Sequence, residues 1–326
     1  MAGNEIVAVD IGGTHARFAI ADIAGPTPLL GEWTTLRTAD HVSLTSAWRA
    51  FAAGAGRPLP RAAGIAVATP LGGETLKLTN NPWVLRPASL AAELGLDSLT
   101  LVNDFGAVAH AVARLDEQWL HPLAGPPGPL PAEGVTTIVG PGTGLGVALL
   151  LRRHGHTHVI ETEGGHVDFA PLDPIETRIL DRLRARYRRV SVERIVSGPG
   201  LANIHEALAG IEGHAVTPGD DTALWTAALA GDDPLAVAAL DRFCLSLGSV
   251  AGDLALAQGA NGVAIAGGIG PRIADILPRS GFAHRFAAKG RFEARMAAIP
   301  IRLVTHPQPG LFGAAAAYVE AHRPAR

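Results

Sequence analysis

The 326-residue sequence contains very little cysteine and lysine. Cys244 is the single cysteine, so no disulfide can form within the chain, and a reducing compartment is expected. Because Cys244 lies in the apolar run "FCLSLGSVAGDLALA", we expect a buried, unreactive thiol. Lysine occurs only at Lys77 and Lys289, so arginine carries nearly all the positive charge.

Strong charge, aromatic residues and long apolar runs are also scarce. Charged residues make up 17% of the sequence, aromatic residues 5%, and the formal net charge is -3. This balance argues against nucleic acid or an anionic membrane as a partner and favours small molecules. Residues 1–10 lack the features of a signal peptide, and no uninterrupted apolar run approaches the ~20 residues of a membrane span. We therefore expect a soluble, cytoplasmic protein.

What the sequence does contain is a repeated pattern of two apolar runs separated by a glycine turn. The pattern occurs at 6–23 and again at 136–151, and an offset of 130 residues aligns Gly12 with Gly142. Each copy predicts a strand, a tight turn and a second strand. Further strands are expected at 64–70, at 98–104, at the start of 262–277 and at 301–306, with helices at 87–95, at 174–189 and from Pro271.

This alternation of strands and helices predicts α/β layers, and the length favours two domains or one bilobed unit. The segment 123–134, "LAGPPGPLPAEG", is dense in proline and glycine and is the best linker candidate. We expect two lobes of related core, joined near this segment, with a cleft between them.

The two glycine turns are candidates for phosphate binding. Without a Cβ, backbone N–H groups can converge on an anion, although most such turns serve ordinary hairpins. A P-loop is excluded because no lysine follows the glycines, and a Rossmann fingerprint is excluded because a strand follows them instead of a helix. Asp10, beside the first turn, either binds Mg²⁺ through water or caps the turn.

A polar pair, Asn103 and Asp104, ends the apolar run at 98–104 just before a predicted helix. A carboxylate at such a position is costly to bury unless a polar group meets it. Judged from the local sequence alone, Asp104 is expected to cap a helix that begins at Phe105 or Gly106. The alternative is that Asp104 accepts a proton from a bound substrate.

Six segments resemble bacterial ATP-dependent glucokinases, in the same order and over about residues 6–315. They are "VDIGGTHARFAIAD", "LVNDFGAVA", "VGPGTGLGVALL", "ETEGGHVDFAP", "ERIVSGPGL" and "GVAIAGGIGPR". The resemblance implies an α/β, two-lobed ribonuclease H-like/actin-like ATPase fold, duplicated, with a cleft between a small and a large domain. We expect residues 1–112 with 300–326 to form the small domain, and residues 113–299 the large one.

The resemblance also implies roles for particular residues. It makes Asp104 the general base for transfer of the γ-phosphoryl group of Mg·ATP to the 6-hydroxyl of glucose. The resemblance therefore favours proton acceptance by Asp104 over the helix-capping role that the local sequence alone favours. The implied glucose ligands are Asn103, Asp104, Glu163, His166 and Glu193. The implied phosphate ligands are Asp10, Gly12, Gly13, Thr14, Gly142, Thr143 and Gly144, with adenosine near Gly267 and Gly268.

Two residues depart from the family pattern, in which Asn is common at position 15 and Ala at position 141. His15 and Pro141 stand there instead, and Pro141 cannot donate a backbone N–H to a phosphate. Related enzymes are often dimers, so a homodimer is possible. The alternatives are a kinase of the same fold acting on fructose, mannose or an amino sugar, or a sugar-sensing regulator without catalysis.

Two sets of residues allow a metal site as a rival interpretation. Glu163, His166 and Asp168 could form a cluster, but we expect Asp168 to support His166 or the local turn. The alternating residues His154, His156 and His158 are better explained as one face of an exposed strand or hairpin.

Overall fold

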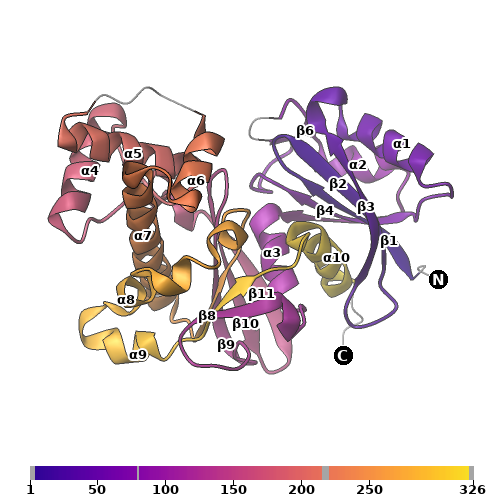
Figure 1. The fold of residues 1–326 in the computed structure, drawn as a ribbon. Helices are drawn as coiled ribbons and strands as arrows, with labels where there is room; N and C mark the ends of the chain where they lie inside the picture. The colour runs from indigo at the N-terminus through magenta and orange to yellow at the C-terminus, as the bar shows by residue number, and fades with distance from the viewer. Residues whose placement is uncertain (1–3, 79–80, 215–219, 323–326) are drawn as a thin grey trace. The chain divides into compact units, whose positions relative to one another are not determined.

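The computed structural model describes residues 4–78, 81–214 and 220–322, and the chain divides into two units (Figure 1). Unit 1 comprises Met1–Asp116 and His306–Arg326, and unit 2 comprises Glu117–Thr305. The chain therefore crosses from one unit to the other twice, after Asp116 and after Thr305. Each unit contains its own mixed β-sheet and its own helices.

Unit 1 contains a five-stranded sheet with the order β3-β2-β1-β4-β7. Its strands are β1 (Glu5–Ile11), β2 (His15–Asp22), β3 (Leu29–Arg37), β4 (Ala62–Val67) and β7 (Ser98–Asn103). Strands β5 (Leu76–Lys77) and β6 (Val84–Leu85) form a separate pair. The helices are α1 (Leu44–Gly54), α2 (Pro87–Leu94), α3 (Asp104–Val112) and α10 (Pro309–Ala321).

Unit 2 contains a six-stranded sheet with the order β11-β10-β9-β12-β13-β8. Its strands are β8 (Leu120–Ala124), β9 (Gly134–Pro141), β10 (Leu145–Arg153), β11 (His156–Thr162), β12 (Gly262–Ile265) and β13 (Ile301–Val304). Its helices are α4 (Pro174–Arg186), α5 (Gly198–Glu212), α6 (Asp221–Ala230), α7 (Pro234–Gln258), α8 (Phe282–Ala287) and α9 (Glu293–Ala297).

The two sheets repeat one pairing pattern. In unit 1, β1 pairs antiparallel with β2 and parallel with β4, and β4 pairs parallel with β7. In unit 2, β9 pairs antiparallel with β10 and parallel with β12, and β12 pairs parallel with β13. The predicted strand–turn–strand repeat is therefore confirmed, and it extends to two further parallel strands in each unit.

Strand β1 is buried on both faces, which explains its unbroken apolar sequence. Side chains alternate along a strand, so Val7 and Val9 enter the core that contains Trp48 and Phe51 of α1. Ile6 and Ala8 point to the other face and pack with α10. Unit 1 therefore has three layers, with helices on both sides of its sheet.

Helix α7 forms the centre of unit 2. Its 25 residues are long and apolar enough to cross a membrane by length and composition alone, but 67% of its apolar 18-residue stretch is buried inside the structure. Gly248 lets α8 approach, since a Cβ there would lie 2.2 Å from the carbonyl oxygen of Phe282. Cys244 is fully buried on α7, as expected, and burial raises the pKa of its thiol to about 12.

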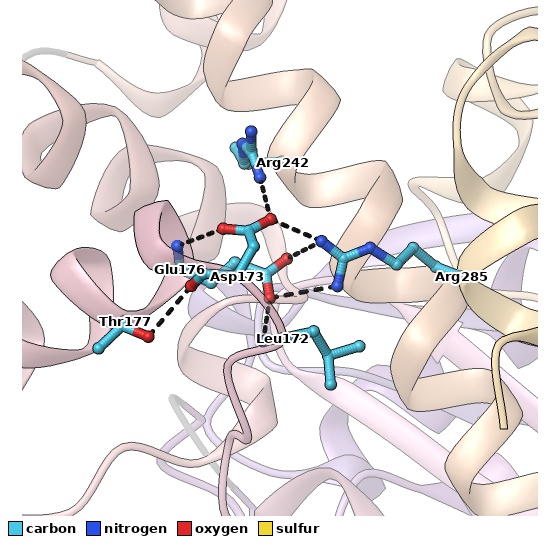
Figure 2. A network of polar contacts seen from close by, with 6 residues as sticks. All are labelled: Leu172, Asp173, Glu176, Thr177, Arg242 and Arg285. Atoms are coloured by element: carbon cyan, nitrogen blue, oxygen red, sulfur yellow. Dashed lines mark hydrogen bonds and ion pairs between the residues drawn. The ribbon is translucent and has the colours of Figure 1, made fainter. Parts of the chain in front are cut away.

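An ionic cluster of four residues joins α4 to α7 and α8 (Figure 2). The carboxylate of Asp173, the N-cap residue of α4, accepts hydrogen bonds at 2.6 Å from both Arg242 and Arg285. Glu176 is buried, contacts Arg285 at 3.2 Å and accepts from the Leu172 N–H at 2.6 Å. The cluster therefore fixes the chain that leads from the Glu163–His166 segment into α4.

Two expectations from the sequence are wrong. The segment 123–134 is not a linker, because it lies inside unit 2, where buried Arg302 donates to the carbonyl oxygens of Pro126 and Gly128. No α-helix starts at Pro271 either. The chain forms the short 3-10 helix Gly270–Ile273 there, followed by a second one at Leu277–Arg279.

Candidate active site

In unit 1, the predicted site residues lie at one edge of the sheet. The parallel strands β1, β4 and β7 end together, with Ile11 in register with Val67 and Val67 in register with Asn103. The glycine turn after β1 and the polar pair after β7 are thus two strands apart, about 10 Å at the usual strand spacing. Ligands of open α/β sheets bind at this carboxyl edge.

Other parts of unit 1 hold the first glycine turn in shape. The Gly12 N–H donates to the carbonyl oxygen of His15 at 2.9 Å. Buried Thr38 donates its hydroxyl to the Gly13 carbonyl at 2.9 Å, and Asn81 donates to the Gly12 carbonyl at 3.2 Å. Sequence reasoning did not find Thr38 or Asn81, because both are distant in the chain and neither belongs to a motif.

Asp10 lies between the β-hairpin and the start of α10. Its carboxylate accepts from Arg17, the cross-strand partner, at 3.5 Å, and a Cβ on Gly310 would lie 2.8 Å from Oδ2. Burial raises the pKa of Asp10, and Arg17 only partly offsets this effect. A partly buried carboxylate whose partner lies as far away as 3.5 Å is suited to receive a cation.

The helix cap is Asn103, not Asp104. The Asn103 Oδ1 accepts the N–H groups of Phe105 at 2.9 Å and Gly106 at 3.2 Å, and α3 begins at Asp104 itself. The Asn103 amide donates to the Thr69 carbonyl at 3.4 Å. Asp104 is partly buried in the first turn, where its Oδ1 accepts from the Phe105 N–H at 2.8 Å. The expectation that Asp104 caps the helix is wrong, because its neighbour already fills that position.

In unit 2, three glycine-containing segments meet at the corresponding edge. The Gly142 N–H donates to the Gly144 carbonyl at 2.8 Å, and the Gly142 carbonyl accepts from Gly198 at 2.7 Å. Gly267, at φ +78°, packs on Pro141, where a Cβ would lie 2.5 Å from the carbonyl oxygen. Gly268 is exposed beside it, and a Cβ there would meet no part of the described chain within 4 Å apart from its neighbours in sequence.

The hydrogen bond from Gly198 to Gly142 brings the N-terminus of a helix next to the glycine turn, and the sequence predicted no role for this terminus. Helix α5 begins at Gly198, and the Ser197 side chain caps it by accepting from the Gly200 N–H at 3.1 Å. The N–H groups of Gly198 and Gly200 are used in these two contacts and Pro199 has none, so it is the positive end of the helix dipole that favours an anion here. The Ser-Gly-Pro sequence at 197–199 is a helix-start signal that could have pointed to this segment.

Glu163, His166 and Glu193 also belong to unit 2. The carboxylate of Glu163 and the imidazole of His166 are 3.9 Å apart and largely exposed. Glu193 accepts from the Leu145 N–H at 2.9 Å, directly after the turn Gly142–Gly144. Val167–Phe169 pairs with Val190–Val192 through backbone hydrogen bonds of 2.9 and 3.0 Å, which joins the His166 segment to the Glu193 segment.

Asp168 supports the local turn, as one of the two predicted options requires. It contacts the Arg189 guanidinium at 2.6 Å, and Arg189 also donates to the His166 carbonyl at 2.7 Å. Within residues 4–78, 81–214 and 220–322, no group of three His, Cys, Asp or Glu residues is arranged to hold a metal. His156 and His158 lie on the exposed face of edge strand β11, with His154 in the preceding turn. The exposed-strand interpretation of these histidines is confirmed.

The comparisons with known proteins agree over nearly the whole chain. The family model "Glucokinase" matches residues 7–321. A glucokinase of Zymomonas mobilis subsp. mobilis is 64% identical over 96% of this chain and 97% of its own. A glucokinase of Xanthomonas oryzae pv. oryzae (strain MAFF 311018) is 43% identical over 98% and 96% of the two chains.

Solved structures give the same fold. A glucokinase from an Antarctic psychrotroph superposes with a TM-score of 0.84 at 34% identity, covering 96% of this chain and 98% of that one. A ROK family glucokinase from Streptomyces griseus, in complex with glucose and AMPPNP, superposes with a TM-score of 0.64 at 20% identity over 95% and 98% of the chains. The likeness to the second structure shows the fold alone.

Proposed function

This chain belongs to the glucokinase family, and from that membership we propose that it transfers the γ-phosphoryl group of ATP to the 6-hydroxyl of D-glucose through the residues named below. It is an ATP-dependent hexose phosphotransferase with the fold shared by sugar kinases and actin-like ATPases. A cytoplasmic location and a homodimeric state, which the family likeness implies, complete the proposal.

One observation carries the assignment of roles in unit 1. The glycine turn 12–14 and the pair Asn103–Asp104 follow strands that end at one edge of the same sheet. A phosphate held by the turn and a hydroxyl beside Asp104 would therefore meet at this edge. The carboxylate of Asp104 accepts the hydroxyl proton as the phosphoryl group arrives, and no covalent enzyme intermediate is needed.

Asn103 has a double role in this proposal. Its Oδ1 caps α3, which places Asp104 in the first helical turn, while its amide Nδ2 is the group that orients the hexose. The Phe105 N–H donates to one oxygen of Asp104, which restricts the orientation of the carboxylate. Both side chains thus obtain their positions from the start of one helix.

The remaining hexose ligands are the unit 2 residues Glu163, His166 and Glu193. Carboxylates accept charge-assisted hydrogen bonds from hydroxyl groups, and an imidazole can donate or accept. A site that bonds several hydroxyls discriminates against sugars that lack or invert them, because its polar groups are then left unpaired. Specificity for glucose therefore belongs mainly to these three side chains together with Asn103.

ATP is held by backbone groups of both units. Gly12, Gly13 and Thr14 in unit 1, and Gly142, Thr143 and Gly144 in unit 2, bind its phosphates, with adenosine near Gly267 and Gly268. Pro141 takes no part as a donor, and its carbonyl instead accepts from the Ile269 N–H at 3.1 Å. The Gly267 segment is thereby fixed next to the phosphate turn.

Asp10 fits the role of the Mg²⁺ carboxylate. It is partly buried with a raised pKa, and the guanidinium of its partner Arg17 is 3.5 Å away, so a cation would stabilise its ionised form. Mg²⁺ commonly takes one or two carboxylates and completes its shell with water and substrate phosphates. When bound, the ion would neutralise charge on the transferred phosphoryl group.

Replacement of Asp104 tests the central role. In Asp104→Asn we expect kcat to fall about 10²- to 10⁴-fold, the usual contribution of a general base. The calorimetric Kd for glucose should change only a few-fold, because the amide retains the shape. An ADP-release assay with and without glucose, fructose, mannose and glucosamine measures both turnover and specificity.

The matched control is Asp116→Asn, since Asp116 is exposed just beyond α3. Its kcat should equal that of the unaltered protein. A folded Asp104→Asn variant with undiminished kcat would remove Asp104 from the proposed chemistry.

A further inference from the structure

The proposed hexose ligands of unit 2 and the proposed phosphate turn meet at one residue, Leu145. Its N–H donates to Oε2 of Glu193 at 2.9 Å. Its carbonyl oxygen lies against Gly165, where a Cβ would come within 2.1 Å. Gly165 is part of the 3-10 helix Gly164–His166. Both segments that carry proposed hexose ligands therefore contact the first residue after the turn 142–144.

The backbone of Glu193 is held on both sides, so only its side chain can move easily. On one side, the Val192 N–H donates to the Val167 carbonyl at 2.9 Å. On the other, Asn203 donates to the Arg194 carbonyl at 2.8 Å, and the Arg194 guanidinium lies 4.3 Å from the centre of the Tyr187 ring. The carboxylate of Glu193 thus reaches the turn from a backbone segment that is held in place.

Gly144 provides the space that this carboxylate occupies. A Cβ at position 144 would lie 2.4 Å from Oε2 and 3.3 Å from Cδ of Glu193, and no other described residue apart from its chain neighbours would come within 4 Å. A Cβ at Gly142, in the same turn, would meet none of the described residues within 4 Å apart from its chain neighbours. Neither glycine has a positive φ, so alanine fits the backbone at both positions. An alanine at 144 would therefore displace the Glu193 carboxylate, whereas an alanine at 142 would not.

We propose that Glu193 couples hexose binding to the geometry of the phosphate turn, a role that rests on the proposed function. One carboxylate oxygen holds the N–H of Leu145, and the other accepts a hydrogen bond from a hexose hydroxyl. A bound hexose fixes the carboxylate, and the carboxylate fixes the backbone at 142–145 for the nucleotide phosphates. By linkage, a bound nucleotide must raise the affinity for the hexose by the same factor.

The test compares two alanine variants of one turn. Gly144→Ala displaces the Glu193 carboxylate, so calorimetry without nucleotide should give a Kd for glucose that is about tenfold higher or more, as expected for a lost hydrogen bond to a charged group. Gly142→Ala should bind glucose like the unaltered protein and should lose affinity only for the nucleotide. Equal glucose affinity in Gly144→Ala and the unaltered protein overturns the coupling role.

A double-mutant cycle assigns the effect to Glu193. In a Glu193→Ala background, Gly144→Ala should have no further effect on the Kd for glucose, whereas additive effects overturn the proposal. With a non-hydrolysable ATP analogue, the factor by which nucleotide tightens glucose binding should fall toward one in Glu193→Ala, and an unchanged factor also overturns it. An unaltered protein that binds no glucose would instead refute the proposed function.

Discussion

At the residue scale, His110 makes folding sensitive to mild acid. It lies on α3, and burial lowers its pKa from 6.5 to about 4, with Glu320 opposing and Arg114 reinforcing the shift. Between these values the unfolded chain binds a proton and the folded protein does not. Stability must therefore fall as pH drops through this window, by about 2 kcal/mol between pH 7 and pH 5 for this residue.

Denaturant titrations at pH 7 and pH 5 measure this contribution. His110→Gln, which stays neutral, should lose about 2 kcal/mol less than the unaltered protein over the same interval. His121→Gln serves as the control because His121 is exposed, and it should keep the full acid sensitivity. Parallel curves for His110→Gln and the unaltered protein would show that His110 does not carry the effect.

Single residues were predictable where chain neighbours determine their surroundings. The buried thiol of Cys244 followed from its apolar flanks. The local sequence alone favours the wrong member of the Asn103–Asp104 pair as the cap of α3, because the two differ only in where the first helical turn begins. The contact between Glu193 and Leu145 could not be predicted, since 48 residues separate them and only the fold joins them.

At the scale of elements, Asn103 has two roles at the start of α3, as the cap of the helix and as a proposed hexose ligand, and substitutions can separate them. Asn103→Asp keeps a capping oxygen and should retain the melting temperature, but it loses the amide donor and should raise KM for glucose. Asn103→Ala removes both functions and should also destabilise the protein by about 1 kcal/mol. Thermal denaturation and steady-state kinetics of the two variants test this division. Equal glucose KM in Asn103→Asp and the unaltered protein would leave Asn103 with the cap alone.

The stability of the protein should be sensitive to the loss of a charged partner from the ionic cluster at the start of α4. Burial alone would raise the pKa of Asp173, but the Glu176 N–H and the guanidinium groups of Arg242 and Arg285 bring it below its usual value. Arg285→Ala leaves buried Glu176 without its ionic partner and should destabilise the protein by about 3 kcal/mol (Figure 2).

Chemical denaturation of Arg285→Ala measures this loss, and Arg295→Ala on the next helix, an exposed position, provides the matched control. The control should cost less than about 0.5 kcal/mol. Similar stabilities for both variants would mean that the cluster contributes little.

Strands were easier to predict than short helices. Apolar runs with glycine turns located β1, β2, β9 and β10, because register and turn are both encoded locally. The helix expected from Pro271 is two short 3-10 helices instead. Pro271 is compatible with the first turn of either kind of helix, so the signal could not distinguish them.

At the scale of the whole molecule, the repeated sheet topology was visible in the sequence as the glycine-turn pattern, and family resemblance supplied the fold. The position of 123–134 was not predictable. Its proline and glycine content is typical of linkers, but residues far along the chain, among them buried Arg302 and Asn261, donate hydrogen bonds to its carbonyl oxygens and hold it inside unit 2. We propose that units 1 and 2 are the small and large domains.

The proposed reaction requires residues of both units to act on the same two substrates, so we expect the units to move together when substrates bind. Small-angle X-ray scattering should show a smaller radius of gyration with D-glucose and a non-hydrolysable ATP analogue than without them. L-glucose, which matches the solvent contrast, is the control and should have no effect. Identical profiles with the two enantiomers would exclude such a closure.

The burial of Cys244 has a practical consequence for measuring that motion. A thiol with no exposed surface and a pKa of about 12 does not react with maleimides while the protein is folded. One surface cysteine introduced into each unit would therefore accept fluorophores or spin labels without prior removal of a native thiol. The protein is thus suited to distance measurements in which each label reports on one unit as the substrates arrive.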